Sequence, residues 1–167
     1  MTMMNKHTVG YFLLLVIAIA VGAALFLKTP TKAPTATIIQ PLVVLEEGTR
    51  AGMERKVNYH IQSQEELATV WTMVYPENAP ALPAVDFSRD DVLAVFDGTK
   101  PSGGHAIKIL HVIDEKDKGR VVTVVHEKPA GECMTTQEVT SPFQFVVVKK
   151  SPLPIIREDI EREIPCQ

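Results

Sequence analysis

The pattern of hydrophobic and polar residues beyond residue 37 predicts a domain built mainly from β-strands. The clearest signal lies at 57–61, where Val57, Tyr59 and Ile61 alternate with polar residues, as in a strand with one buried face. Further strands are predicted at 42–46, 92–96, 105–113, 120–128 and 142–150. A short charged turn separates 105–113 from 120–128, so these two runs are expected to pair as an antiparallel hairpin.

One segment has helical spacing instead. Ser63 stands three residues before Glu66, which is the reciprocal capping pattern. Four apolar residues then share one helical face: Leu67, Val70, Trp71 and Val74. This predicts a helix over 63–75, and its apolar face needs a sheet to pack on. The predicted fold class is therefore α+β, mainly antiparallel β in a sheet- or sandwich-like arrangement, with one packed helix.

The last segment, 151–167, fits two interpretations. Ile156, Ile160 and Ile164 recur every four residues between Pro154 and Pro165, which suits a short amphipathic helix lying on the domain. The charged residues between them suit a frayed tail equally well. The sequence leaves both interpretations of this tail open.

The N-terminal part predicts attachment to a membrane. After a short flank at 1–8, residues 9–27 form an apolar run of 19, long enough for a transmembrane helix and longer than the core of most cleaved signals. A Pro-, Thr- and Ala-rich spacer follows at 28–37 and leads into the domain at 38–150. We expect a single-pass membrane protein with an extracytoplasmic domain, or a secreted protein if the segment is cleaved.

Charge and cysteine content narrow the possible partners. All 20 acidic residues but only 14 of the 17 basic ones follow Lys32, so the domain carries six net negative charges and nucleic acid is not an expected partner. In an oxidising compartment Cys133 and Cys166 could close a loop of about 34 residues through a disulfide. In a reducing compartment they would remain two unpaired thiols.

The segment "VDFSRDDVLAVFDGTKPSGGHAIKI" contains a specific motif: an Asp-Phe-Ser lead-in, an apolar strand, and a Lys-Pro-Ser-Gly-Gly loop that opens the next strand. It resembles the PrcB C-terminal domain family, which is named for a subunit of a bacterial surface protease complex. The chain departs from the family pattern at His105, where tyrosine is common. Other residues support the resemblance across 62–150: Glu65, Trp71, Cys133 and the segment "TSPFQFVVVKK".

The resemblance implies association with other secreted proteins, and it implies no catalytic residues. The loop at 98–105 has two interpretations. In the first, Pro101, Gly103 and Gly104 serve only to turn the chain, because proline fixes φ and glycine tolerates positive φ. Alternatively, the glycines allow the backbone of a partner to come close. In the second case the expected contact residues are Lys100, Pro101, Ser102, Gly103, Gly104 and His105.

The candidate chemistry is weak, and no cofactor is expected. A phosphate-binding loop would end in Gly-Lys-Ser/Thr before a helix, whereas here Lys100 precedes the glycines and a strand follows. His60, His105, His111 and His126 lack metal-ligand spacing, although His105 and His126 are expected on one face of the hairpin. Ser102, Ser141 and Cys133 stand in no nucleophile motif.

The sequence therefore favours a noncatalytic, membrane-tethered protein-binding domain, an accessory or assembly subunit of an exported protease. The alternative is a protease inhibitor that inserts the loop at 98–105 into an active-site cleft. A metal-binding protein or a hydrolase is a lesser alternative.

Overall fold

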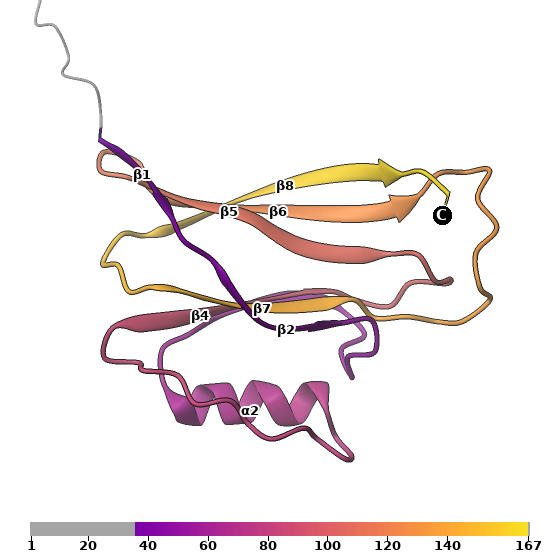
Figure 1. Cartoon of the computed structure of the whole chain (residues 1–167), viewed down its shortest axis with the longest axis horizontal. Helices are drawn as coiled ribbons and strands as arrows, with labels where there is room; N and C mark the ends of the chain where they lie inside the picture. The colour runs from indigo at the N-terminus through magenta and orange to yellow at the C-terminus, as the bar shows by residue number, and fades with distance from the viewer. Residues whose placement is uncertain (1–35, 167) are drawn as a thin grey trace, which may run out of the picture. The chain divides into compact units, whose positions relative to one another are not determined.

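The computed structural model describes residues 36–166, which form two four-stranded sheets and one helix (Figure 1). Sheet A has the strand order β1 (Thr37–Gln40), β5 (Ala106–Glu115), β6 (Gly119–Pro129) and β8 (Ile155–Ile164). Sheet B has the order β2 (Val43–Gly48), β7 (Phe143–Lys149), β4 (Asp90–Asp97) and β3 (Lys56–Ile61). All neighbouring pairs are antiparallel except β6 and β8. This confirms the predicted α+β, mainly antiparallel class for the described residues.

The molecule has three layers, with sheet B in the middle (Figure 1). The inter-sheet core fills the space between sheets A and B and consists of Leu93, Val95, Ile107, Ile109, Val112, Val122, Val124, Val146 and Val148. On the other face of sheet B, helix α2 (Gln64–Val74) packs its apolar side onto alternate residues of the same strands. Because β4 is covered on both faces, its sequence is a continuous apolar run rather than an alternating one.

Helix α2 begins as the sequence predicts. Ser63 is the N-cap, and its Oγ accepts a hydrogen bond from the Glu66 amide at 3.1 Å. The Glu66 carboxylate accepts from the amide of Gln62 at 2.7 Å, one residue before the position expected for a reciprocal cap. Trp71 packs on Phe145 of sheet B, with ring centroids 5.4 Å apart. Its indole nitrogen donates to the Pro80 carbonyl at 3.1 Å, which ties down the loop after the helix.

A buried ion pair joins the two sheets. Arg120 is only 2% exposed, and its Nε and Nη2 donate to the two carboxylate oxygens of Asp114 at 2.6 and 2.8 Å. Its Nη1 donates to the Lys149 carbonyl of sheet B at 2.6 Å, and Gln40 of β1 donates to Asp114 at 2.8 Å. One guanidinium therefore fixes how β5, β6 and β7 lie against one another.

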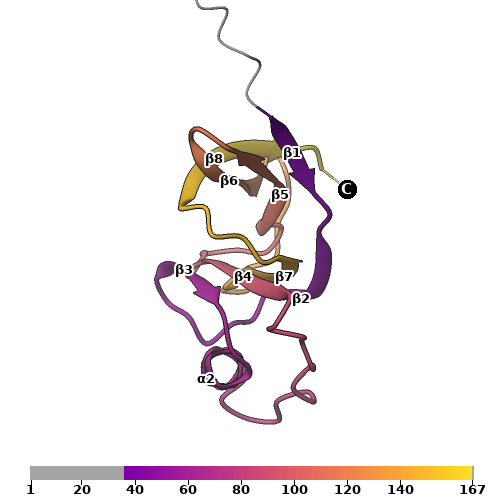
Figure 2. The ribbon, with the colours of Figure 1, turned by 90° about the vertical axis from the view of Figure 1, so that its left-hand side faces the viewer.

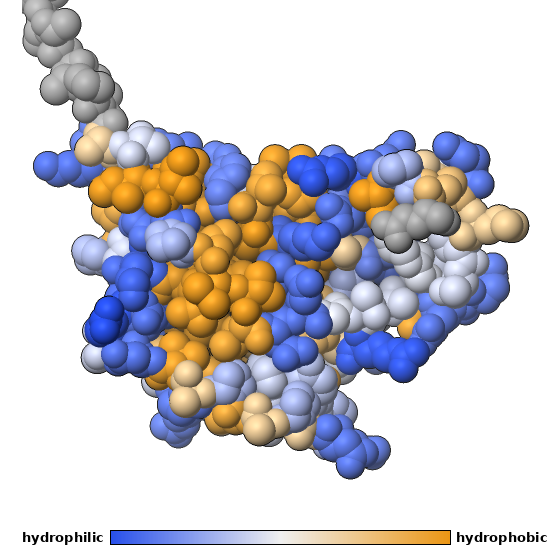
Figure 3. Space-filling model, viewed as in Figure 1, coloured by the Kyte–Doolittle hydropathy of each residue, from blue (hydrophilic) through white to orange (hydrophobic). Residues whose placement is uncertain are grey.

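The sandwich differs at its two sides. On one side the chain passes directly from β1 in sheet A to β2 in sheet B (Figures 1 and 2). This crossing leaves apolar side chains exposed, and Figure 3 shows them gathered over β1 and β2; they include Ile38, Ile39, Val43 and Val44. On the opposite side, β8 and β3 are the last strands of their sheets (Figure 2).

Residues 155–164 form strand β8, so both interpretations of the tail, helix and frayed end, are wrong. β8 pairs in parallel with β6, and Ile156 and Ile160 lie beside Val121 and Val125. A four-residue spacing fits a strand as well as a helix, because every second residue of a strand shares a face. The partner that decides between them is the edge of β6, whose backbone groups would otherwise stay unpaired.

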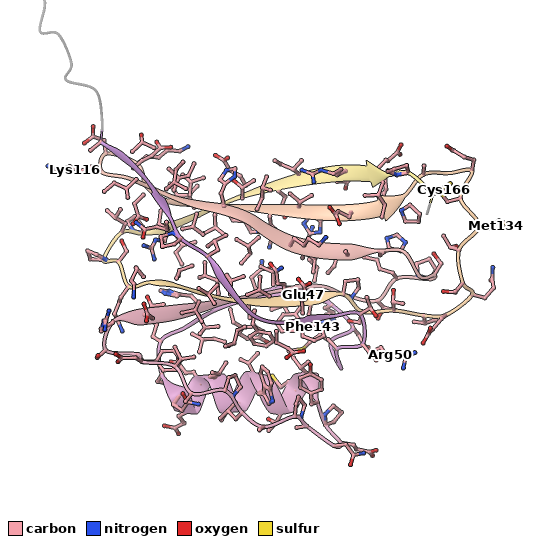
Figure 4. The ribbon with its side chains drawn as sticks, viewed as in Figure 1. Glu47, Arg50, Lys116, Met134, Phe143 and Cys166 are labelled. Atoms are coloured by element: carbon pink, nitrogen blue, oxygen red, sulfur yellow. A yellow bond between two sulfur atoms is a disulfide. The ribbon has the colours of Figure 1, made fainter. Side chains whose placement is uncertain are left out.

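A disulfide links Cys133 and Cys166, whose Cα atoms are 5.2 Å apart. Figure 4 shows Cys166 just after β8, beside the loop that carries the fully exposed Met134. The bond fastens the end of β8 to the connection between β6 and β7.

The predicted membrane segment at 9–27 lies outside the described residues, as does nearly all of the predicted spacer at 28–37. Within residues 36–166, no helix is long and apolar enough to cross a membrane.

Removing the disulfide should destabilise the domain. We expect the double variant Cys133→Ser/Cys166→Ser to lose about 3 to 4 kcal/mol of unfolding free energy, because the bond closes a loop of about 34 residues in the unfolded chain. Urea unfolding followed by the fluorescence of Trp71, the only tryptophan, measures this loss. The unaltered chain in reductant should match the variant, and equal stability of the oxidised chain and the variant would contradict the prediction.

Candidate functional site

The loop at 98–105 joins β4 to β5 and is held by the segment that precedes β7. The backbone of Lys100 pairs with Thr140 in both directions, at 2.7 and 3.0 Å. Thr140 also donates through Oγ1 to the Ser102 carbonyl at 3.0 Å, and the Gly103 amide donates to the Thr136 carbonyl at 3.1 Å. The loop is therefore fixed along its length by the chain itself.

Close packing within the domain explains the glycines of this loop. Gly98 has φ of 68°, and a Cβ there would lie 2.8 Å from the Glu54 carbonyl oxygen. Gly104 has φ of 84° and packs on Pro129. Gly98 and Gly104 therefore have positive φ, whereas Gly103 does not. Gly103 is needed for space, since its Cβ would lie 2.3 Å from Thr136 Oγ1.

Only part of the predicted contact loop faces solvent. Pro101 and Gly104 are exposed, whereas the other four predicted contact residues are half-buried: Lys100, Ser102, Gly103 and His105. Burial and the nearby Lys100 ammonium lower the pKa of His105, and Asp97 partly opposes this. Most of the loop therefore lies against the domain, where hydrogen bonds to residues 136–140 hold it.

A chain of charged side chains, here called the polar network, runs inward from this loop. Lys100 Nζ lies 2.9 Å from Asp97 Oδ2, and Asp97 Oδ1 lies 2.7 Å from His126 Nδ1. The other ring nitrogen of His126 lies 2.6 Å from Asp159 Oδ1. Asp159 also pairs with Arg157 and, at 3.8 Å, with Lys56. The network connects the contact loop with β6, β8 and β3.

The electrostatics of the network favour a charged Asp159. Partial burial alone would raise the pKa of this carboxyl group. Hydrogen bonds from His126 and Arg157, together with the charges of Arg157 and Lys56, outweigh burial, so the pKa of Asp159 lies below its ordinary value. Its negative charge therefore contributes to the stability of the folded state.

The network is arranged for structure more than for acid–base chemistry. Both ring nitrogens of His126 are engaged by carboxylates, so neither faces a nucleophile. Cys133 is bonded to Cys166 and offers no thiol, and Ser141 Oγ donates to the Met53 carbonyl.

The other histidines have protein neighbours of their own. His60 lies 2.9 Å from Asp91, and His111 lies 2.9 Å from Thr123. Across the hairpin, Ile107 faces His126 as predicted, although a bulge between Ile109 and His111 shifts the rest of the register by one residue. In residues 36–166, no group of three or more His, Cys, Asp or Glu side chains is placed to hold a metal ion.

A groove opens at the side of the sandwich where β8 is the edge strand of sheet A and β3 is the edge strand of sheet B. This edge groove has a volume of about 430 Å³. Its floor comes from the inter-sheet core and is apolar: Leu93, Val95, Val122 and Val124. Its walls carry Asn58 and His60 from β3 and Ile155 and Arg157 from β8, and Leu153 and Pro154 also line it.

Sequence reasoning missed Asp97, Arg157 and Asp159 as members of a site. In the sequence, Arg157 and Asp159 fall in the tail that fits either a helix or a frayed end, and Asp97 lies between the motif residues Phe96 and Gly98 without a predicted role. The one available signal was the alternation of Ile156, Ile160 and Ile164 with polar residues at even spacing, which also fits a strand.

Comparison with known proteins supports the resemblance found in the sequence. The model of the PrcB C-terminal family matches residues 92–149, which run from within β4, through the loop at 98–105, to the end of β7. The predicted family is thereby confirmed for this segment, and α2 lies outside the match. Searches of curated proteins and of solved structures found no match to the chain.

Gly98→Ala should destabilise the domain by about 1 to 3 kcal/mol, because alanine at positive φ is strained and its Cβ would press on the Glu54 carbonyl. Gly131→Ala is the matched control, since a Cβ at Gly131 would meet nothing within 4 Å. Urea unfolding of both variants measures the difference. Equal stability of the two variants would show that the loop does not need its left-handed glycine.

Asp159→Asn should reduce stability at neutral pH and make the domain less sensitive to acid. Because the folded state lowers the pKa of Asp159, its contribution is present above the unfolded pKa of about 3.9 and is lost as pH falls through the lower folded value. The stability gap between the parent and Asp159→Asn should therefore be larger at pH 7 than at about pH 3. Glu161→Gln, at an exposed site on the same strand, is the control. A gap independent of pH would contradict the assignment.

Proposed function

Because residues 92–149 belong to the PrcB C-terminal family, we propose that this chain is a noncatalytic accessory or assembly subunit of an exported protease complex. The family match carries the proposal, since this family is named for a subunit of a protease complex. In this role the domain binds the protease, and residues 9–27 tether it to the membrane.

The contact with the protease is proposed at the end of the sandwich that carries the loop at 98–105. There the loop is hydrogen-bonded to 136–140. We give the name end surface to four exposed residues here: Pro101 and Gly104 of the loop, and Met134 and Val139 of the connection between β6 and β7. Met134 and Val139 are 102% and 64% exposed, which gives this end apolar area for a partner. Because hydrogen bonds and the disulfide already fix both segments, binding orders little additional chain.

Two further observations support an exported domain. The Cys133–Cys166 disulfide is of the kind that persists in oxidising compartments and is rare in the cytosol. The apolar run at 9–27 provides a route to such a compartment.

The shape of the loop favours the accessory role over the inhibitor alternative. An inhibitor that occupies an active-site cleft presents an extended loop for the protease to grip. Here four of the six predicted contact residues are half-buried against the domain. A loop that is held against its own domain suits docking beside a protease better than insertion into its cleft.

Site-specific photocrosslinking tests the proposal in the native organism. The full chain carries a benzophenone amino acid in place of Pro101, or in place of Met73 on α2 as a control that is also exposed. We expect an exported protease, identified by mass spectrometry, to crosslink from position 101 and not from position 73. Failure to capture a protease from position 101 would contradict the proposed contact.

Activity of the captured protease then separates the two roles. We expect peptidase activity to be unchanged or raised when the purified full chain is added. Stoichiometric loss of activity would instead establish the inhibitor function.

A further inference from the structure

The edge groove has the shape of a sandwich side that lacks a strand. On the β1–β2 side, continuous chain crosses between the sheets and covers the core (Figure 2). On the β3–β8 side, the inter-sheet core residues Leu93, Val95, Val122 and Val124 remain at the floor of an open groove of about 430 Å³. These four side chains are each no more than 5% exposed, so an occupant would gain apolar contact with the floor rather than cover an exposed patch.

Two backbone edges flank this groove. Among the described residues, β8 pairs only with β6 and β3 pairs only with β4. The outer edge of each strand therefore has free amide and carbonyl groups along the groove. An extended peptide can pair with such an edge and direct every second side chain toward the core.

The groove wall at Arg157 continues into a cluster around Asp159 in which permanent cations outnumber carboxylates. Two permanent cations, Arg157 and Lys56, share the single carboxylate of Asp159, and His126 approaches the same oxygen. The contacts of the Arg157 guanidinium run from Nη2 alone, and its Nε is buried without an acceptor. A further carboxylate in the groove would be complementary to this surplus of positive charge.

We infer that the edge groove binds an extended segment of a partner protein, which adds a strand beside β8 and places apolar side chains and one carboxylate in the groove. The carboxylate faces Arg157, and the apolar side chains contact the apolar floor that the inter-sheet core provides. This rests on the proposed function in one respect: the partner segment belongs to the protease complex.

The free strand edges favour a peptide over a small amphipathic acid such as a fatty acid. Both ligands would fill the apolar floor and reach Arg157 with a carboxylate. Only a peptide would also satisfy the unpaired backbone groups of β8 or β3. A small acid is therefore an outcome that the experiment has to distinguish.

The probe is a fluorescein-labelled, end-capped heptapeptide, Lys-Val-Thr-Glu-Thr-Val-Lys, in which Val, Glu and Val point to one side of an extended chain. Binding to the full chain in lipid nanodiscs is followed by fluorescence anisotropy. We expect saturable binding, and hydrogen exchange should show new protection of amides in 155–159 and none in α2. Absence of binding, or protection confined to other strands, would overturn the inference.

Two changes test the charge. Glu→Gln in the probe and Arg157→Gln in the protein should each weaken binding about tenfold or more, and the two together no more than either alone. Independent, additive effects would show that the carboxylate does not meet Arg157. If Arg157→Gln fails to fold, Arg157→Lys and the altered probe keep the test decisive.

Two variants test the location. Asn58→Trp places a large side chain at the exposed rim of the groove and should abolish binding. Lys108→Trp is the matched control: Lys108 is also exposed on a strand, between residues of the inter-sheet core, and points away from them. Equal binding to both variants would place the peptide elsewhere.

Backbone methylation separates a peptide strand from a small acid. In an extended chain, alternate amides point to opposite sides, so N-methylation of one alternate set should abolish pairing with the edge strand. If both methylated sets still bind and decanoate displaces the probe, the groove is a small-molecule site and the inference is wrong. Probe binding without a protease crosslink from position 101 would refute the end-surface contact alone, and the reverse result would refute the groove alone.

Discussion

Sheet B must bury both of its faces, and the arrangement of the other elements follows from this constraint. The side chains of β4 alternate between two cores: Leu93 and Val95 point to sheet A, whereas Ala94 and Phe96 point to the helix. Each face needs its own cover, so sheet A lies over one and α2 over the other. The loop at 98–105 leaves from the end of this fixed strand, which explains how the position of the contact loop is held. Asp97 is the last residue of β4, so the same strand also fixes the position of the carboxylate that contacts His126 in the polar network.

The buried charged side chains of the domain fix how its strands lie against one another. Arg120 is almost fully buried, yet its guanidinium donates to Asp114 and to the Lys149 carbonyl, and Asp114 in turn accepts from Gln40. Removing both charges from water costs free energy. The pair nevertheless makes the strand arrangement specific, because a shifted strand would leave one charge buried without its partner. The network around His126 does the same between β4, β6 and β8. The exception is Arg157, whose incomplete set of acceptors coincides with the open side of the sandwich.

Local signals made α2 and β3 predictable from the sequence, because Ser63, Glu66 and the alternation of 57–61 depend on residues close in the chain. The family motif also identified the segment that the family model matches. Strand β8 was not predictable in this way. Ile156 and Ile160 fit a helix and a strand equally, and the edge of β6 that decides the matter lies some 35 positions earlier in the chain. The polar network brings together four strands, β3, β4, β6 and β8, that are distant in sequence, so no local pattern could reveal it. The glycines of the loop were recognised, but which of them takes positive φ depends on contacts with Glu54, Thr136 and Pro129.

The parallel pairing of β8 has a consequence for how the chain matures. The chain is synthesised amino end first, so β4 to β7 precede β8, and the edge of β6 is paired only when this last strand has been made. Cys166 follows β8 directly, and the seated strand places it beside Cys133. The disulfide thus locks in position the strand that completes sheet A.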